Sequence, residues 1–243
     1  SEIGNASSLN TILRETAEKL TDKHPDYLSI YLVFALFIAG SRFIQRRDMI
    51  QRMVYGGSIL LLLFLLLILA ARSPILALVV ASTVISFLRI KKPVIRWIAS
   101  LSLLGTFLLV IRLTPAIWSR VMEFRNTPLV TPVGAQYNST NIRVGIYHCS
   151  WNLIREHMLA GVGAGSDNKL LMDCYSRMPT DAYQKTFYNT HNQYVNFWLV
   201  SGIFSLLLFA ASLVYAFLLS IRRKDHTLLF FLILMSVAFL SEN

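Results

Sequence analysis

The sequence predicts an all-α protein that crosses a membrane several times. Hydrophobic residues make up 55% of the 243-residue chain and the mean hydropathy is +0.54, well above that of a soluble domain. A helix of about 18 residues spans roughly 27 Å, close to the ~30 Å hydrocarbon core of a bilayer. Six apolar runs approach or exceed this length, although the first and third need flanking residues to complete a crossing. They occupy residues 28–41, 54–71, 74–88, 94–111, 193–221 and 227–241.

Clusters of arginine and lysine indicate which side of the membrane each loop faces. Such clusters follow the first, third and fifth runs, at residues 42–52, 89–96 and 222–224, whereas the turn between the second and third runs carries only Arg72. Because short cytoplasmic loops are enriched in Lys and Arg, we expect the three clusters on the cytoplasmic side. They explain part of the net charge of +10 and would contact anionic membrane lipids, so nucleic-acid binding is not expected.

The chain is expected to comprise four parts. Residues 1–26 form an external polar segment, residues 27–111 four transmembrane helices, residues 112–192 a large external loop with an amphipathic helix, and residues 193–243 two further transmembrane helices. The chain begins with Ser1 and stops directly after an apolar run, which is typical of a piece of a larger membrane domain.

The external parts contain weaker patterns. A short amphipathic helix is expected from Ser8 to just before His24. Residues 113–140 are rich in turn formers and are expected to be mostly irregular, with one helical turn near residues 118–124. Residues 166–190 are polar and mixed in charge, which indicates a solvated loop or short helices.

Residues 141–157 are expected to form the amphipathic helix, because apolar residues recur there at helical spacing. Arg143, Tyr147 and Trp151 form a stripe beside the apolar face, at intervals of four residues. This helix either lies against the membrane face with Arg143 reaching inward, or is an interfacial helix whose arginine pairs with lipid phosphate. The pattern leaves both interpretations open.

A glycine-rich segment, residues 161–165, ends this helix. No Lys-Ser or Lys-Thr pair follows it and no strand precedes it, so it is neither a Walker A motif nor a dinucleotide fingerprint. Its backbone N–H groups could bind an anion, although a tight turn is the commoner role. Cys149 and Cys174 both fall in the external loop, where a disulfide is chemically possible but not established by two isolated cysteines.

Arg72 and His191 are candidate chemical groups at the membrane boundary. Arg72 either clamps an anion, since guanidinium forks match phosphate oxygens, or snorkels to the lipid headgroups. His191 lies where the fifth run enters the membrane, beside Asn192 and Tyr194. An imidazole titrates near neutral pH and can take a proton from a hydroxyl; an interfacial histidine bonded only to backbone is the alternative.

Together with Arg143, these residues suggest a metal-free transfer site. The two arginines would hold a lipid diphosphate, and His191 would activate an acceptor hydroxyl, so that the diphosphate leaves as a stabilised anion. The external acidic residues lack the spacing of metal ligands, so no metal cofactor is expected.

Three segments resemble the bacterial O-antigen ligase and polymerase family. Residues 191–204, HNQYVNFWLVSGIF, are similar to its His-Asn-x-x-Leu…Gly-x-x-Gly signature. Residues 157–165, HMLAGVGAG, preceded by Arg143, look like its Arg…Pro-Leu-x-Gly-Val-Gly-x-Gly segment. Residues 69–78, LAARSPILAL, resemble its Ser/Thr-Arg-x-x-Leu turn. The resemblance covers roughly residues 24–243, apparently the C-terminal part of the family's membrane domain.

The chain departs from these motifs at three places, and none of them removes a charged group. Ala71 replaces a hydroxyl residue, Met158 replaces a proline, and Phe204-Ser205 stands where the second glycine is usual.

The resemblance implies a ligase in the bacterial inner membrane that transfers glycan from undecaprenyl diphosphate to lipid A-core at a periplasmic site, without a cofactor. It assigns Arg72 and Arg143 to the diphosphate and His191 to the base or leaving-group contact, with Asn192 and Tyr194 as further substrate contacts. A polymerase that extends lipid-linked repeat units shares these motifs and remains open. A transporter or flippase for an anionic lipid is the third interpretation, although repeated halves and broken spans are not evident. The glycan, the acceptor and the oligomeric state are not defined by the sequence.

Overall fold

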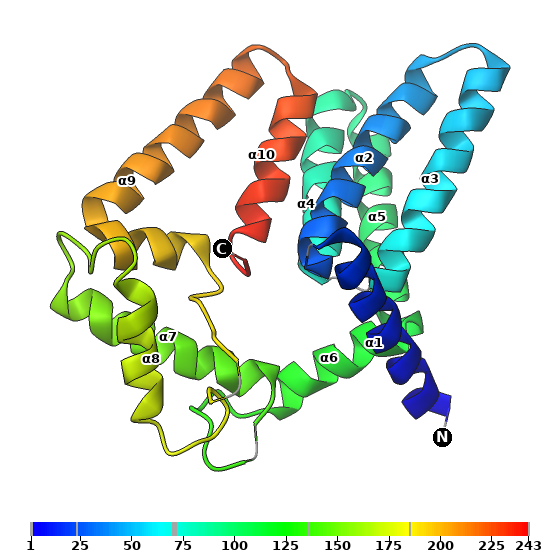
Figure 1. Ribbon diagram of the computed structural model, residues 1–243. Helices are drawn as coiled ribbons and strands as arrows, with labels where there is room; N and C mark the ends of the chain where they lie inside the picture. The colour runs from blue at the N-terminus through cyan, green and yellow to red at the C-terminus, as the bar shows by residue number, and fades with distance from the viewer. Residues whose placement is uncertain (1, 23, 70–71, 136, 185, 243) are drawn as a thin grey trace. The chain divides into compact units, whose positions relative to one another are not determined.

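The computed structural model describes residues 2–22, 24–69, 72–135, 137–184 and 186–242, with the backbone alone for residues 2–11, 72, 116 and 120. The described residues are helical and connecting segments, as the sequence predicts (Figure 1). The helices are α1 (Glu2–Thr21), α2 (Pro25–Gln45), α3 (Met49–Leu69), α4 (Arg72–Arg89), α5 (Pro93–Leu113), α6 (Pro115–Asn126), α7 (Ser139–Glu156), α8 (Asp167–Ser176), α9 (Gln193–Arg222) and α10 (His226–Ala238).

The chain divides into two compact units. The first unit comprises Ser1–Arg120 and Ser220–Ala238, and the second comprises Val121–Leu219 and Phe239–Asn243. The first unit therefore holds α1 to α5 and α10, and the second holds α7, α8 and most of α9.

Several helices have the length and surface of membrane spans. Among the described residues, α2, α3, α5 and α9 are long and apolar enough to cross a bilayer, and α4 and α10 are shorter apolar helices. Large apolar side chains on these helices are exposed, including Phe64 on α3 and Leu108 on α5. Because apolar surface of this extent is stable only against lipid, the protein is an α-helical, multi-pass membrane protein.

Close packing joins the apolar helices of the first unit. α2 packs against α3, and α4 packs against α5 and α10. Ala77 and Ala81, one turn apart on α4, are completely buried, and such small residues let membrane helices approach closely. The ring of Phe37 on α2 stacks on that of Phe230 on α10, with 3.9 Å between centroids. These contacts make a single helical bundle of the first unit.

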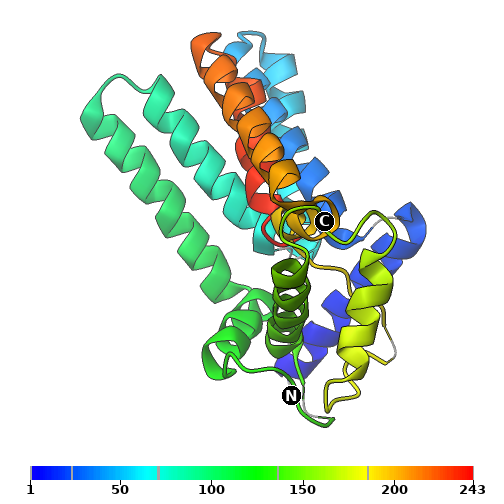
Figure 2. The same cartoon turned by 90° about the vertical axis from the view of Figure 1, so that its left-hand side faces the viewer.

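The three basic connections lie at one end of this bundle. They are residues 46–48 between α2 and α3, residues 90–92 between α4 and α5, and residues 223–225 between α9 and α10. Figures 1 and 2 show all three at the same end of the helices. Alternating spans require this arrangement, and the charge pattern predicts it.

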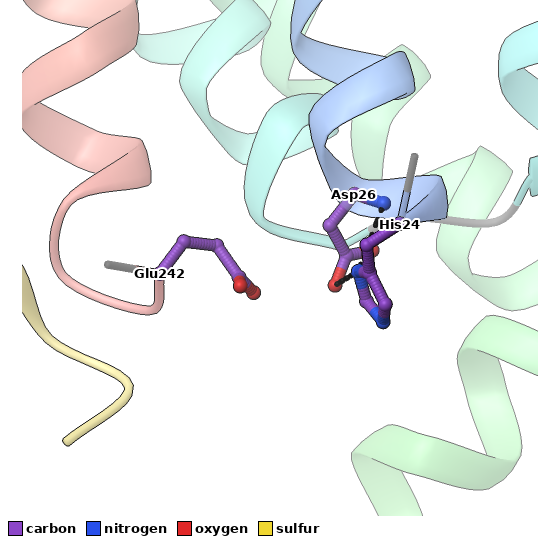
Figure 3. A group of neighbouring side chains, drawn as sticks. All are labelled: His24, Asp26 and Glu242. Atoms are coloured by element: carbon purple, nitrogen blue, oxygen red, sulfur yellow. Dashed lines mark hydrogen bonds and ion pairs between the residues drawn. The ribbon is translucent and has the colours of Figure 1, made fainter. Parts of the chain in front are cut away.

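The N-terminal helix is held to the bundle by polar contacts. The Arg14 guanidinium donates to the Leu69 carbonyl at 2.5 Å and lies 3.4 Å from the Asp26 carboxylate. His24 caps α2: its Nδ1 accepts the Asp26 N–H at 3.4 Å and lies 3.6 Å from Asp26 Oδ2 (Figure 3). The expected helix at the N-terminus is present, but it begins at Glu2 rather than near Ser8.

The expectation that residues 113–140 are mostly irregular is wrong for the first part of that segment. Residues 115–126 form α6, a helix of twelve residues. Pro115 occupies its first position, where the missing N–H costs nothing. The Arg112 guanidinium lies over the Trp118 ring at 4.6 Å, which fixes the first turn.

Candidate active site

The amphipathic helix α7 forms one wall of the second unit. The predicted range, 141–157, agrees with the observed Ser139–Glu156. A capping box starts the helix: Asn138 Oδ1 accepts the Thr140 and Asn141 N–H groups, and Asn141 Oδ1 accepts the Asn138 N–H. The buried face carries Ile142, Gly145, Ile146, Cys149, Ser150 and Ile154. Most of the expected apolar face is therefore the core of this unit.

A disulfide joins α7 to α8. Cys149 and Cys174 are bonded, with 5.9 Å between their Cα atoms, a pairing that the sequence left open. Leu171 and Tyr175, on the same side of α8, pack into the same core as Ile146. The short helix α8 is thus fastened to α7 both covalently and by apolar contact.

Two buried tyrosines support the adjoining segments. Tyr175 and Tyr183 stack with centroids 4.5 Å apart. The Tyr183 hydroxyl donates to the Ile142 carbonyl at 2.9 Å, and the Tyr175 hydroxyl donates to the Tyr188 carbonyl at 3.3 Å. Burial raises the pKa of Tyr183 to about 12 and raises the pKa of Tyr175 further, so both hydroxyls keep their protons at neutral pH.

Gly145 makes room for one of these hydrogen bonds. A Cβ at this position would collide with the Tyr183 hydroxyl. Glycine on the buried face of α7 therefore allows Tyr183 to reach the helix backbone at Ile142, one residue before Arg143.

Helix α9 is broken at Gly202, where φ is 78° and ψ is 179°. Figure 1 shows the helix changing direction. The segment after α7 bonds to both sides of the break. Val162 N–H donates to the Leu199 carbonyl at 2.8 Å and Gly163 N–H to the Val200 carbonyl at 2.9 Å. In the other direction, the Met158 carbonyl accepts the Ile203 N–H at 3.0 Å. The break thus has its backbone groups paired within the protein, as burial or lipid requires.

This break was not expected, because residues 193–221 read as one continuous apolar run. The glycine-rich segment forms a turn, the commoner of its two predicted roles, and the N–H groups of Val162 and Gly163 are used by α9. Anion binding by the remaining N–H groups stays a prediction. Only glycine adopts the positive φ angles of 72°, 88° and 86° at positions 161, 163 and 165 without strain.

Arg143 and His191 line the same pocket, which has a volume of about 340 Å³. Arg143 is exposed and, among the described residues, its guanidinium has no ion-pair partner. His191 is half-buried, and its ring lies 6.1 Å from that of Tyr188 between centroids. The pocket is lined by Tyr137, Asn138, Ser139, Ile142, Arg143, Ile146, Tyr188 and His191. It combines a cation, a titratable imidazole and several hydroxyl or amide groups.

The backbone at His191 is held in an uncommon conformation. Its φ is +47°, in the left-handed region, and its N–H donates to Asn189 Oδ1 at 3.1 Å. Asn192 then caps α9, with Oδ1 accepting the N–H groups of Tyr194 and Val195. Two asparagine side chains thereby fix the turn that carries the imidazole.

The remaining predicted site residues lie elsewhere. Asn192 also donates from Nδ2 to the Leu240 carbonyl at 3.3 Å, and the Tyr194 ring packs between Phe209 and Phe239. Neither Asn192 nor Tyr194 is among the lining residues of the pocket. Arg72 begins α4 in the first unit, and its side chain lies outside the described residues, as does Ala71.

Tyr188 and Asn138 belong to the pocket but were not among the predicted site residues. Tyr188 stands three positions before His191, and that proximity is the only signal in the sequence. Asn138 stands at the start of the amphipathic helix, where its capping role is the usual expectation.

No curated protein matches the chain. The family described as O-antigen ligase matches residues 57–210, which is more than half of the chain and includes both α7 and the start of α9. The protein therefore belongs to the O-antigen ligase family.

Proposed function

We propose that the protein transfers glycan from an undecaprenyl-diphosphate carrier to lipid A-core. Glycosyl transfer of the O-antigen ligase type follows from the family. One observation supports a catalytic role for specific residues: Arg143 and His191 line one pocket of about 340 Å³. The pocket supplies the two functions that such a reaction needs, which are neutralisation of a diphosphate and removal of a hydroxyl proton.

In the proposed reaction, the acceptor hydroxyl oxygen attacks the anomeric carbon of the donor sugar. The new glycosidic bond forms as the bond from that carbon to the phosphate oxygen breaks, and the electron pair stays on the diphosphate. The Arg143 guanidinium binds the diphosphate oxygens and stabilises the charge that develops on them. Neutral His191 takes the hydroxyl proton.

The conformation of His191 supports its role. A non-glycine residue at positive φ is uncommon, and such conformations cluster at functional sites when the surroundings hold them. Here Asn189 and Asn192 hold the turn.

Arg72 is proposed as the second diphosphate contact, on its sequence motif alone. Asn192 and Tyr194 remain predicted substrate contacts, although their described interactions are structural. Two guanidinium groups would replace a divalent cation, so we expect transfer to continue in the presence of EDTA. Loss of activity in EDTA that magnesium or manganese restores would contradict this assignment.

The pocket is proposed to face the periplasm, from the inner membrane. The basic connections at one end of the first unit support a cytoplasmic position for that end. The disulfide in the second unit supports an oxidising compartment for the pocket.

Single-turnover transfer by the full-length protein tests the proposal. His191→Ala should slow the chemical step by about 10²–10⁴-fold and leave donor affinity largely intact, because a general base acts on the acceptor. His157→Ala is the control, since His157 is exposed and lines neither this pocket nor the other pocket of the second unit. Loss of donor affinity with an unchanged chemical step would make His191 a diphosphate ligand instead, and wild-type behaviour in both would exclude it from the mechanism.

A polymerase would use the same chemistry with a lipid-linked repeat unit as acceptor. The glycolipid that accumulates in a deletion strain distinguishes the two: long lipid-linked polymer indicates a ligase, and a single lipid-linked repeat unit indicates a polymerase. Transporters use the free backbone carbonyls of broken helices to bind ions. The break in α9 does not support a transporter, because the Leu199 and Val200 carbonyls accept hydrogen bonds from Val162 and Gly163.

A further inference from the structure

A second pocket, of about 480 Å³, lies in the second unit between α7 and the start of α9. Its walls are almost entirely carbon. Tyr147 and Trp151 stand on α7, and Val195 and Trp198 stand on α9. The indoles of Trp151 and Trp198 meet edge to face, 5.6 Å apart between centroids. Its volume falls in the range of about 300–1,000 Å³ that is usual for small-molecule pockets.

The helix α7 lines both this aromatic pocket and the pocket that contains Arg143 and His191. On α7, Tyr147 of the aromatic pocket stands one helical turn after Arg143. Val195 lies in the first turn of α9, four residues after His191, which precedes the helix. The two pockets share no lining residue, but each has lining residues on α7 that neighbour those of the other. A ligand with an anionic group at Arg143 would therefore have Tyr147, a lining residue of the aromatic pocket, as its neighbour along α7.

The lining suits a hydrocarbon better than a sugar. Each sugar hydroxyl that leaves water needs a new hydrogen-bond partner, and the carbon-lined walls supply few. Trp198 Nε1 already donates to the Met158 carbonyl at 3.3 Å. The Arg155 guanidinium lies over the Trp151 ring at 5.4 Å and helps to hold that wall in place.

Tyr147 and Trp151 are also left uncovered by the protein, with 37% and 44% of their surfaces exposed. Exposed aromatic groups that surround a cavity gain free energy when an apolar group fills it.

We propose that the aromatic pocket binds the isoprene units of the donor lipid nearest to its diphosphate. This inference rests on the proposed function, and it adds a site for the lipid chain on the periplasmic helix α7. The pocket then contributes to donor affinity and to the choice of an isoprenoid carrier, and the Arg143 pocket contributes the chemistry.

The test compares soluble donors that carry the same glycan diphosphate on a short prenyl chain, on a saturated alkyl chain of equal carbon number, or on a methyl group. Full-length protein in nanodiscs is assayed for KM and kcat with each. In the wild type, the prenyl donor should have a lower KM than the methyl donor. In Trp151→Ser, the ratio of the KM for the methyl donor to the KM for the prenyl donor should fall about tenfold, because an apolar wall of the pocket is lost. We call this ratio the prenyl advantage.

Tyr147→Ser is the second variant, in case Trp151→Ser is poorly folded, and a thermal unfolding curve is recorded for both. Phe187→Ser is the matched control: Phe187 is 47% exposed in the same unit and lines neither pocket, so the advantage should persist. A photoreactive prenyl diphosphate should label peptides containing residues 144–154 or 195–198.

The outcomes separate this inference from the proposed function. If the wild type transfers glycan and both serine variants keep the full prenyl advantage, this inference is overturned and the proposed function stands. An equal advantage for the saturated chain would show that the pocket takes any hydrocarbon and would overturn the assignment to isoprene units. Absence of transfer from every donor would refute the proposed function and this inference with it.

Discussion

Gly161 and Gly202 approach each other across the break in α9 so closely that neither position has room for a Cβ atom. A Cβ on Gly161 would meet the Val200 carbonyl carbon and oxygen at 2.5 Å and the Gly202 nitrogen at 2.6 Å. A Cβ on Gly202 would collide with the Leu159 carbonyl group. The backbone contact that holds the glycine-rich segment to α9 therefore requires glycine on both sides.

Gly161→Ala and Gly202→Ala should each destabilise the protein by about 1–3 kcal/mol or more, because the clash is with backbone and φ is positive at both sites. Gly105→Ala is the control, since Gly105 is helical and a Cβ there meets nothing within 4 Å. Thermal unfolding in detergent measures the difference. Equal melting temperatures for all three variants would show that the contact contributes nothing.

Reduction of Cys149–Cys174 should destabilise the second unit by about 3 kcal/mol, as expected for a loop of 25 residues. The measurement is thermal unfolding with and without reductant. A Cys149→Ser, Cys174→Ser double variant should be less stable than the wild type and insensitive to reductant. Free thiols at Cys149 and Cys174 in the purified protein, at unchanged stability, would contradict this prediction.

Alkaline pH should destabilise the second unit through Tyr183. The folded-state pKa, about 12, lies above the ordinary value of 10.0, so the contribution of this group is complete below pH 10 and is lost as the pH rises through 12. Tyr183→Phe should cost about 1 kcal/mol at neutral pH, since one hydrogen bond is lost, and should show a weaker alkaline loss. Unfolding monitored with tyrosinate absorbance checks both. An identical alkaline profile in the variant would assign the transition to another group.

Arg143→Lys should reduce transfer by about ten- to a hundredfold, because lysine keeps the charge but loses the planar fork that matches two phosphate oxygens. Arg177→Lys is the control, on an exposed arginine of the same unit that does not line the pocket. Steady-state transfer and membrane insertion are measured together. Near-normal transfer by the Arg143 variant would favour an interfacial arginine paired with lipid phosphate.

Membrane orientation can be tested with single cysteines at two exposed positions. Lys169→Cys, on α8, should react with an impermeant thiol reagent in spheroplasts, whereas Arg47→Cys, between α2 and α3, should not. The native cysteines are bonded and supply the unreactive background. Reversed labelling would place the pocket in the cytoplasm and remove the periplasmic mechanism.

Much of the fold is predictable from the sequence, because lipid imposes a simple rule on it. A helix that faces hydrocarbon must be long and apolar, and α2, α3, α5 and α9 are recognisable on that ground alone. The amphipathic helix α7 is recognisable as well, since apolar residues at helical spacing form the face that packs on the core of the second unit. The helix α6 was not predicted, because the turn-forming residues from Pro128 onward made the whole segment 113–140 look irregular. The helix ends at Asn126, before those residues begin.

The site was less predictable, because long-range contacts determine it. Arg143 and His191 could be selected by residue type and position, but their shared pocket depends on the hydrogen bonds of Tyr175 and Tyr183. The break at Gly202 was missed because a single glycine in an apolar run does not by itself break a helix. Here, residues 158–163 supply the hydrogen bonds that pair backbone groups on both sides of the break.

Those bonds also have a consequence for biosynthesis. The chain is made from its N-terminus, so the Met158 carbonyl and the Val162 N–H emerge well before Leu199 and Ile203, which are their partners. Until α9 has been synthesised and has entered the bilayer, the glycine-rich segment has only water or other temporary partners. The turn that carries His191 is likewise incomplete until Leu240 arrives to accept the Asn192 amide. Activity should therefore not appear before Leu240 has been translated, and a nascent chain arrested within α9 should be inserted but inert.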